Sequence, residues 1–264
     1  MSIAVRSALI PATLFFLSAG AVLVSQSVDR ELVATISGPT LQGGIVSGLA
    51  WDGATLVIQT AAMDRKNGGI KLGYLMVPGK GMELRPLASP PPGIDKAWKL
   101  KSSRTSPTGL GKIELKTDSK LPLYGIASQG KRFADAMDMG GAVVTTEVRL
   151  GNLVIHKRRD VEPYDGEVWG WSSAELNRVC YVDEKGDLWV ASADGRSPAR
   201  VLKGHFTLPA WSDDGGAIAV VELKGDGGKW EVSVVHLPER YRRNESPFTS
   251  TSLLSRSVAR QISG

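Results

Sequence analysis

Three histidines, His156, His205 and His236, are the side chains of this 264-residue chain best suited to proton transfer or metal binding. A zinc site on one element needs two ligands at short spacing, as in H-x-x-x-H. These histidines are instead separated by 49 and 31 residues, and no pair has that spacing. We interpret them as strand or turn residues, and the sequence predicts no metal site.

Carboxylates offer two further candidates for acid–base chemistry, Glu162 with Asp165 and Asp183 with Glu184. Asp213, Asp214 and the run Gly225–Gly228 have the composition of tight turns and too few ligands for a calcium loop. The chain contains neither a G-x-S-x-G elbow nor a phosphate-binding loop. We therefore predict no catalytic residue and no cofactor.

A repeated pattern between Trp169 and Pro238 predicts the elements that carry these side chains. Each copy begins with Trp-Ser, at Trp171 and Trp211, and continues through a polar turn, an apolar run, a Gly/Asp turn and a second apolar run. The two tryptophans are 40 residues apart. That spacing is typical of a four-stranded propeller blade.

A similar pattern occurs near the N-terminus. Gly48–Gln59 matches Pro209–Val221 in an Ala-Trp pair, an Asp-Gly turn and an alternating apolar strand, and Gly68–Pro78 matches Gly227–Pro238. Trp51 and Trp211 are 160 residues apart, four times the repeat. The prediction is an all-β propeller of five or six four-stranded blades, in which residues 31–36 close the ring by joining the last blade.

The intervening chain is less regular. We expect strands at 112–116, 121–126, 142–148 and 152–156, and long loops at 86–93 and 104–111. Five residues are assigned structural roles in the repeat: Trp51, Trp171, Trp211, Gly53 and Gly215. The tryptophans should fill the wedges between blades and donate their indole N–H to a backbone carbonyl, while the glycines allow the positive φ of tight hairpins.

The run WSDDGGAIAVV, residues 211–221, followed by WEVSVV, residues 230–235, resembles the TolB-type propeller repeat. LWVASADG, residues 188–195, resembles the strand and turn that end such a blade. Asp213 stands where that family usually has proline, and Ala174-Glu175 replaces its Pro-Asp-Gly. The resemblance implies an exported propeller that serves as a protein-interaction module, and it implies no catalytic residue.

The N-terminus carries a charge-free run of 17 residues, 8–24, after Arg6. It is compatible with a cleaved signal peptide, cut near Ser18–Ala21 or Val24–Ser27, and with a retained membrane anchor. Both readings predict export, either to the periplasm or to the periplasmic face of the inner membrane. We therefore divide the chain into a leader or anchor at 1–28, a propeller at 29–238 and a polar tail, with a possible short helix, at 239–264.

The composition limits the kinds of partner that we expect the chain to bind. The single cysteine, Cys180, excludes an internal disulfide framework and lies in an apolar strand pattern. Basic residues cluster at 96–120 and at 156–159, although the net charge is only +5. A basic helix and a stacked aromatic platform are both lacking, so no nucleic-acid partner is expected. The basic residues that we predict to bind a partner are Lys96, Lys99, Lys101, Arg104, Lys112, Arg158 and Arg159.

Together these features predict a non-catalytic, exported interaction module that contacts other protein subunits, as an accessory subunit of a larger membrane complex if residues 8–24 stay in the inner membrane. The alternative is an enzyme or small-molecule binder that uses the central channel of the propeller, as lactonase-like or glycan-cleaving propellers do. Converging histidines and carboxylates would favour this alternative.

Overall fold

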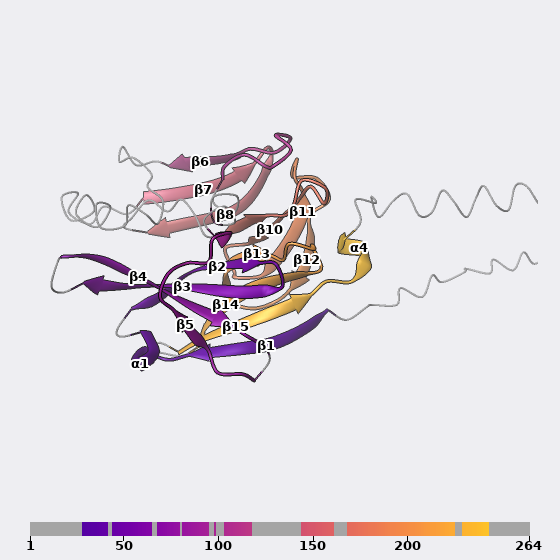
Figure 1. Ribbon diagram of the computed structural model, residues 1–264. Helices are drawn as coiled ribbons and strands as arrows, with labels where there is room; N and C mark the ends of the chain where they lie inside the picture. Colours follow the sequence, from indigo (N-terminus) through magenta and orange to yellow (C-terminus); the bar gives the residue numbers. More distant parts are fainter. Residues whose placement is uncertain are drawn as a thin grey trace, which may run out of the picture.

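The chain folds into four small antiparallel sheets in a propeller-like arrangement, with almost no helix (Figure 1). The computed structural model describes residues 28–41, 44–64, 68–79, 81–94, 98, 103–117, 144–160, 168–224 and 229–242. The all-β fold class predicted from the repeat is confirmed.

Each sheet forms one blade. Blade 1 contains β2 (Ile45–Asp52), β3 (Thr55–Asp64), β4 (Gly69–Val77) and β5 (Arg85–Leu87). Blade 2 contains β6 (Ile113–Thr117), β7 (Val144–Leu150) and β8 (Leu153–Asp160). Blade 3 contains β9 (Trp169–Trp171), β10 (Arg178–Val182), β11 (Leu188–Ser192) and β12 (Ala199–Leu202). Blade 4 contains β13 (Phe206–Trp211), β14 (Ala217–Lys224), β15 (Lys229–His236) and β1 (Asp29–Ile36). Two short helices, α1 (Gly38–Leu41) and α4 (Glu239–Arg242), follow β1 and β15.

The first strand closes the last blade, as predicted. β1 pairs antiparallel with β15, with Asp29 opposite His236 and Ile36 opposite Trp230. The pairing is fixed by Arg30, whose Nη2 donates to Glu222 Oε2 at 2.8 Å and whose Nε donates to Ser233 Oγ at 3.1 Å. The Arg30 guanidinium also lies 4.9 Å from the centre of the Phe206 ring. One side chain of β1 therefore contacts each of the other three strands of blade 4.

The predicted number of blades was wrong, because the described residues form four sheets and not five or six. Trp171 and Trp211 lie in neighbouring blades, as the 40-residue spacing indicated. Trp51 and Trp211, however, are only three blades apart along the chain. The chain between Leu87 and Ile113 and between Thr117 and Val144 takes up the length that the periodicity assigned to another blade. The strand predicted at 121–126 lies outside the described residues.

Blade 2 has an inner segment where the sequence predicts a loop. Residues 103–106 pair with the start of β6 through the Thr105–Lys112 bridge and a bond from Ile113 N to Arg104 O. The turn that follows repeats the geometry of the turn after Trp211. Ser106 N donates to Gly111 O at 2.8 Å, and Ser212 N donates to Ala217 O at 2.9 Å. The serine hydroxyls accept from Gly111 N and Ala217 N, each at 2.9 Å.

Equivalent turns of neighbouring blades touch at one end of the molecule. Gly53 N in blade 1 donates to Asp213 Oδ2 in blade 4 at 2.9 Å. Gly215 in blade 4 packs so closely against the Leu176 side chain in blade 3 that a Cβ added to Gly215 would lie only 2.6 Å from it. Thr108 Oγ1 in blade 2 donates to Asn177 Oδ1 in blade 3 at 2.6 Å. These contacts connect the four turns in series, from blade 1 through blades 4 and 3 to blade 2.

Apolar side chains fill the wedges between blades. One cluster, centred on Ile36, Leu49 and Ile58, joins blades 1 and 4. A second, centred on Leu188, Ile218 and Leu237, joins blades 3 and 4, and a third joins blades 2 and 3 around Leu150 and Trp171. The opposite face of blade 1 is covered by Ile94 and Trp98 from the connection to blade 2. Each blade thus buries a face only because a neighbour is present.

Candidate functional site

The tryptophans of the repeat occupy the predicted wedges, and two of the three make the predicted hydrogen bond. Trp51 Nε1 donates to Ala210 O of blade 4 at 3.2 Å. Trp171 Nε1 donates to Ser103 O of blade 2 at 2.7 Å, and the neighbouring Trp169 shares this acceptor at 3.3 Å. Each bond joins the inner segments of two neighbouring blades.

Trp211 differs from the other two. Its indole ring is buried, but its Nε1 has no hydrogen-bond partner among the described residues. The prediction that the Trp211 indole N–H meets a carbonyl was therefore wrong. In the adjacent blade, the Cys180 thiol donates to Gly170 O at 3.4 Å. Gly53 and Gly215 adopt φ values of +60° and +67°, as expected for their turns.

The predicted basic residues are spread over blade 2 or lie outside the described residues. Lys96, Lys99 and Lys101 belong to the second group. Arg104 and Lys112 are exposed and lie on adjoining segments at the inner edge of the blade. Arg158 and Arg159 belong to β8, opposite Thr146 and Thr145, toward the other end of the same sheet. Their role in binding a partner stays a prediction.

Two of the three histidines line one shallow hollow of about 390 Å³, where blades 2, 3 and 4 meet. His156 comes from β8, and His205 directly precedes β13. The hollow is completed by Lys157 and by the turn from Val182 to Gly186. His156 Nδ1 lies 3.0 Å from Val182 O, which orients the ring.

One carboxylate of this hollow, that of Asp183, has a structural role. Asp183 accepts from Lys185 N, Asp187 N and Trp189 Nε1, each at 2.9 Å, so it holds the β10–β11 turn. Lys157, which lines the hollow, pairs with Glu147 of β7 at 2.9 Å. The hydrogen bond and charge of Lys157 lower the pKa of Glu147, and Glu147 raises the pKa of Lys157 in return. The third histidine, His236, lies 3.3 Å from Glu31 on blade 4, away from this hollow.

A larger concave surface, which we name the rim groove, lies on the outer side of blades 1 and 4. It combines two hollows of about 450 and 500 Å³ that share Met82, Glu83 and Leu84. One hollow is lined by Leu32, Val33, Ala34 and Thr35 of β1 together with Thr40 and Gly81, and the other by Pro78, Arg85 and Pro86. The closing strand therefore faces the loop between β4 and β5.

A sharp turn directs this loop back toward β5. Gly81 has φ of +69°, a conformation that favours glycine, and Met82 N donates to Gly79 O at 3.3 Å. After this turn β5 pairs with β4, with Arg85 opposite Met76 and Leu87 opposite Tyr74. Residues 82–84 are thereby placed beside β1.

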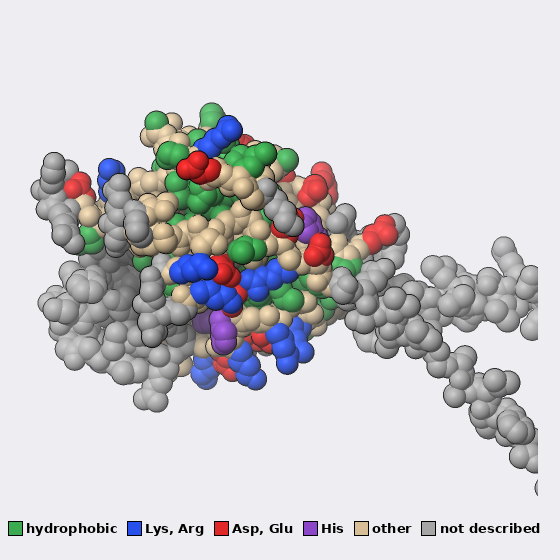
Figure 2. Space-filling view, turned by 90° about the horizontal axis from the view of Figure 1, so that it is seen from below, with side chains coloured by type: hydrophobic (Ala, Val, Ile, Leu, Met, Phe, Trp, Pro, Cys, Tyr) green, Lys and Arg blue, Asp and Glu red, His purple; other side chains and the backbone are tan. Residues whose placement is uncertain are grey.

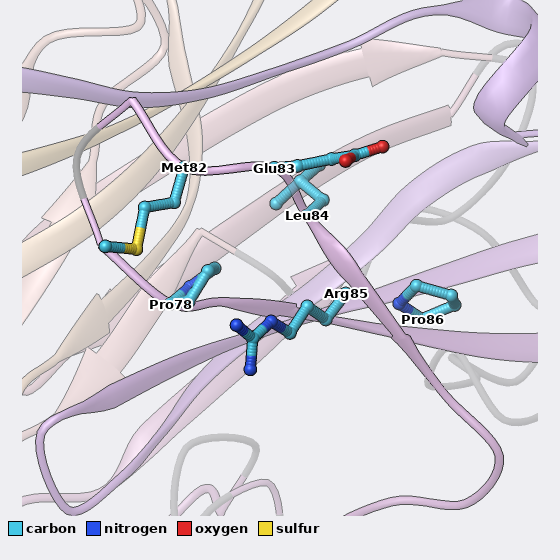
Figure 3. Close-up of a pocket in the computed structure, with 6 residues that line it drawn as sticks. All are labelled: Pro78, Met82, Glu83, Leu84, Arg85 and Pro86. Carbon is cyan, nitrogen blue, oxygen red and sulfur yellow. The ribbon is translucent and has the colours of Figure 1, made fainter.

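The rim groove combines exposed apolar side chains with two unpaired charges. Leu32 is 47% exposed and Met82 is 60% exposed, although both are large and apolar. Glu83 and Arg85 are also exposed, and neither has an ion-pair partner within the described part of the chain. Figure 3 shows Met82 and Arg85 extending on the side of Pro78, whereas the Glu83 carboxylate points the other way.

The wider surface has mixed charge. On the face shown in Figure 2, basic and acidic side chains are interspersed, and apolar atoms reach the surface between them. Among the described residues, no group of three or more histidine, cysteine or acidic side chains is placed to hold a metal ion. No described helix has the length and apolar character to cross a membrane. The run 8–24 lies outside those residues.

A scan against models of protein families finds no match to this chain, and a search of curated proteins finds no relative.

The rim groove was missed by sequence reasoning because it depends on two segments about 50 residues apart becoming neighbours. The sequence carried one usable signal. Residues 31–36 were expected to close the ring, so their outer edge had to border solvent or another segment. The sequence gives no indication that Met82 lies opposite that edge.

Proposed function

We propose that this protein is a non-catalytic interaction module and that its docking site for another protein is the rim groove. The observation that carries the proposal is the pair of exposed apolar side chains, Leu32 and Met82, beside the outer edge of β1. Covering the exposed half of two such side chains stabilises a complex by about 1 kcal/mol each. The flanking charges of Glu83 and Arg85 would add orientation rather than affinity.

The scaffold suits this role. Arg30 and its partners Glu222 and Ser233 hold β1 against blade 4, so one wall of the groove is fixed before a partner arrives. A prearranged wall reduces the ordering cost of association. The TolB-type resemblance of residues 211–235 supports the same class of function.

For its place in the cell, we propose export to the periplasm, with attachment to the inner membrane if residues 8–24 are retained. The proposal rests on the charge-free run that follows Arg6. An anchored chain would act as an accessory subunit of a membrane complex. Of the basic residues of blade 2, Arg158 and Arg159 on β8 would then provide a second contact surface, toward the end of the sheet away from Lys112.

Fractionation of cells that make the native chain tests this proposal. We expect the chain to purify with a companion protein from the membrane or periplasmic fraction, and a combined Leu32→Lys and Met82→Lys variant to lose the companion. Leu110→Lys is the matched control, since Leu110 is 68% exposed on the turn of blade 2. The intact mass shows whether the leader is removed. A companion retained equally by all three chains would contradict the role of the rim groove.

A second function is favoured by the hollow at the junction of blades 2, 3 and 4. His156, His205 and Glu184 line it together, so it could hold a small polar molecule. Titration of candidate metabolites, monitored through the histidine ring signals in NMR spectra, tests this alternative. Shifts confined to His156 and His205, with His236 unchanged, would support it.

A further inference from the structure

The outer strands of the four blades differ in how far they are protected against pairing with another strand. β5 has three residues, including Pro86, and β12 has four, including Arg200. β8 is long but carries Lys157, Arg158 and Arg159 in succession. Short length, proline and clustered charge are the usual means of protecting an edge. β1 has eight residues, and its charges are confined to the first three, Asp29–Glu31, so its last five, Leu32–Ile36, contain neither charge nor proline.

The rim groove exposes the edge of β1 and not only one of its faces. Successive side chains of a strand point to opposite faces of its sheet. Four consecutive residues, 32–35, nevertheless line a single hollow. The hollow must therefore run along the backbone edge of the strand. That edge faces away from β15, because β1 is the terminal strand of its sheet.

The loop on the opposite side limits what can occupy the groove. Residues 81–84 border the same hollow as β1. A second copy of this chain would have to bring its own β1 with a four-stranded sheet behind it, and this loop stands in that path. A single extended segment needs only the width of one strand, about 4.8 Å from β1. The register shift at Val33 further favours a short segment, because a bulge interrupts continuous pairing.

We propose that the rim groove binds an extended segment of a partner protein, which adds to blade 4 as a fifth strand along β1. This inference rests on the proposed function and specifies its partner. Backbone hydrogen bonds to the edge of β1 would provide affinity, as in other cases of strand addition. One apolar side chain of the segment would cover Leu32 and Met82. An acidic side chain near Pro78 would pair with Arg85.

The probe for this proposal is a library of short random peptides displayed on phage and selected on the full chain. We expect enriched peptides with alternating apolar residues and an acidic residue. Synthetic versions should bind the native chain and lose at least about tenfold in affinity with Leu32→Lys or Met82→Lys. Leu110→Lys, at an exposed leucine outside the groove, should bind like the native chain. Thermal unfolding checks that all variants are folded.

Backbone chemistry distinguishes strand addition from side-chain docking. Methylation of peptide nitrogens one at a time should abolish binding at every second position, because only alternate amides of a strand face β1. In the native chain, the amides of residues 32–35 that face away from β15 should exchange more slowly when peptide is present. Peptides that bind without either effect would overturn strand addition and leave the groove as a side-chain site.

Two other outcomes would also overturn strand addition. Peptides unaffected by Leu32→Lys and Met82→Lys would place binding elsewhere, which leaves the interaction-module proposal intact. Selection that enriches no peptide would contradict a strand-binding groove. The fractionation experiment, which identifies any companion protein, then tests separately whether the chain is an interaction module.

Discussion

Gly53 and Asp213 are 160 residues apart, and the backbone N–H of Gly53 donates to Asp213 Oδ2 at 2.9 Å. The bond joins the first hairpin turn of blade 1 to the equivalent turn of blade 4, where the two ends of the ring meet. The carboxylate of Asp213 therefore has a structural role where the ring closes.

Asp213→Ala should destabilise the protein by about 1 kcal/mol, because the bond is charge-assisted but exposed. Asp213→Asn retains an acceptor oxygen and should cost less. Chemical denaturation of the three chains measures the difference. Equal losses for alanine and asparagine would show that the bond to Gly53 does not contribute.

Phenylalanine substitutions separate the two kinds of wedge tryptophan. Trp171→Phe removes the donor to Ser103 O and should cost about 1 kcal/mol more than Trp211→Phe, whose indole N–H has no partner within the described part of the chain. Both changes remove similar apolar volume, so each serves as the control for the other. Equal shifts of the two unfolding midpoints would contradict the conclusion that Trp171, unlike Trp211, is stabilised by an indole hydrogen bond.

The turn at residues 106–111 of blade 2, where the sequence predicts a loop, depends on a serine side chain, so we expect that serine to contribute to the free energy of unfolding. Ser106 is 4% exposed, and its hydroxyl accepts from Gly111 N, as that of Ser212 accepts from Ala217 N. Ser106→Ala would leave a buried N–H unsatisfied and should cost about 1–3 kcal/mol. Ser212→Ala should cost a similar amount. A neutral Ser106→Ala would show that this segment is not an inner strand of the blade.

Glu222 makes the attachment of β1 sensitive to acid. Burial alone would raise its pKa, but the hydrogen bonds and charges of Lys224 and Arg30 outweigh burial and lower the pKa below 4.5. A lowered pKa stabilises the folded chain above pH 4.5, and this contribution is lost as the pH falls through the folded-state value. Native protein should therefore lose more stability than Glu222→Gln between about pH 6 and pH 3.5. Parallel losses in the two proteins would exclude this contribution.

The sequence predicted the features that depend on local pattern. The alternation of residues 217–223 and the Asp-Gly turns gave strands and hairpins, and the short run at 31–36 gave the closing strand. The number of blades could not be obtained this way, since the distance from Trp51 to Trp211 includes residues 88–112 and 118–143, which the periodicity counted as regular blades. The segment 103–106 was missed because it has threonine where three other blades have tryptophan. Its Ser-Pro-Thr-Gly turn has the Ser-x-x-Gly spacing of residues 212–215 and could have revealed it.

Candidate site residues were less predictable than the fold. Charge clustering suggested Arg104, Lys112 and Arg158, but the register of blade 2 places Lys112 and Arg158 toward opposite ends of its sheet. The rim groove arises from a contact between blades 1 and 4. Neither Leu32 nor Met82 belongs to a recognisable motif. Their exposure is a property of tertiary structure.

The most direct test of the rim groove as a docking site is photo-crosslinking in living cells from an unnatural amino acid placed at Met82. We predict a discrete crosslinked species that disappears when Leu32→Lys is added, and no such species from the same amino acid placed at Leu110. Identical products from positions 82 and 110, or a product at 82 that survives Leu32→Lys, would contradict a docking site in the rim groove.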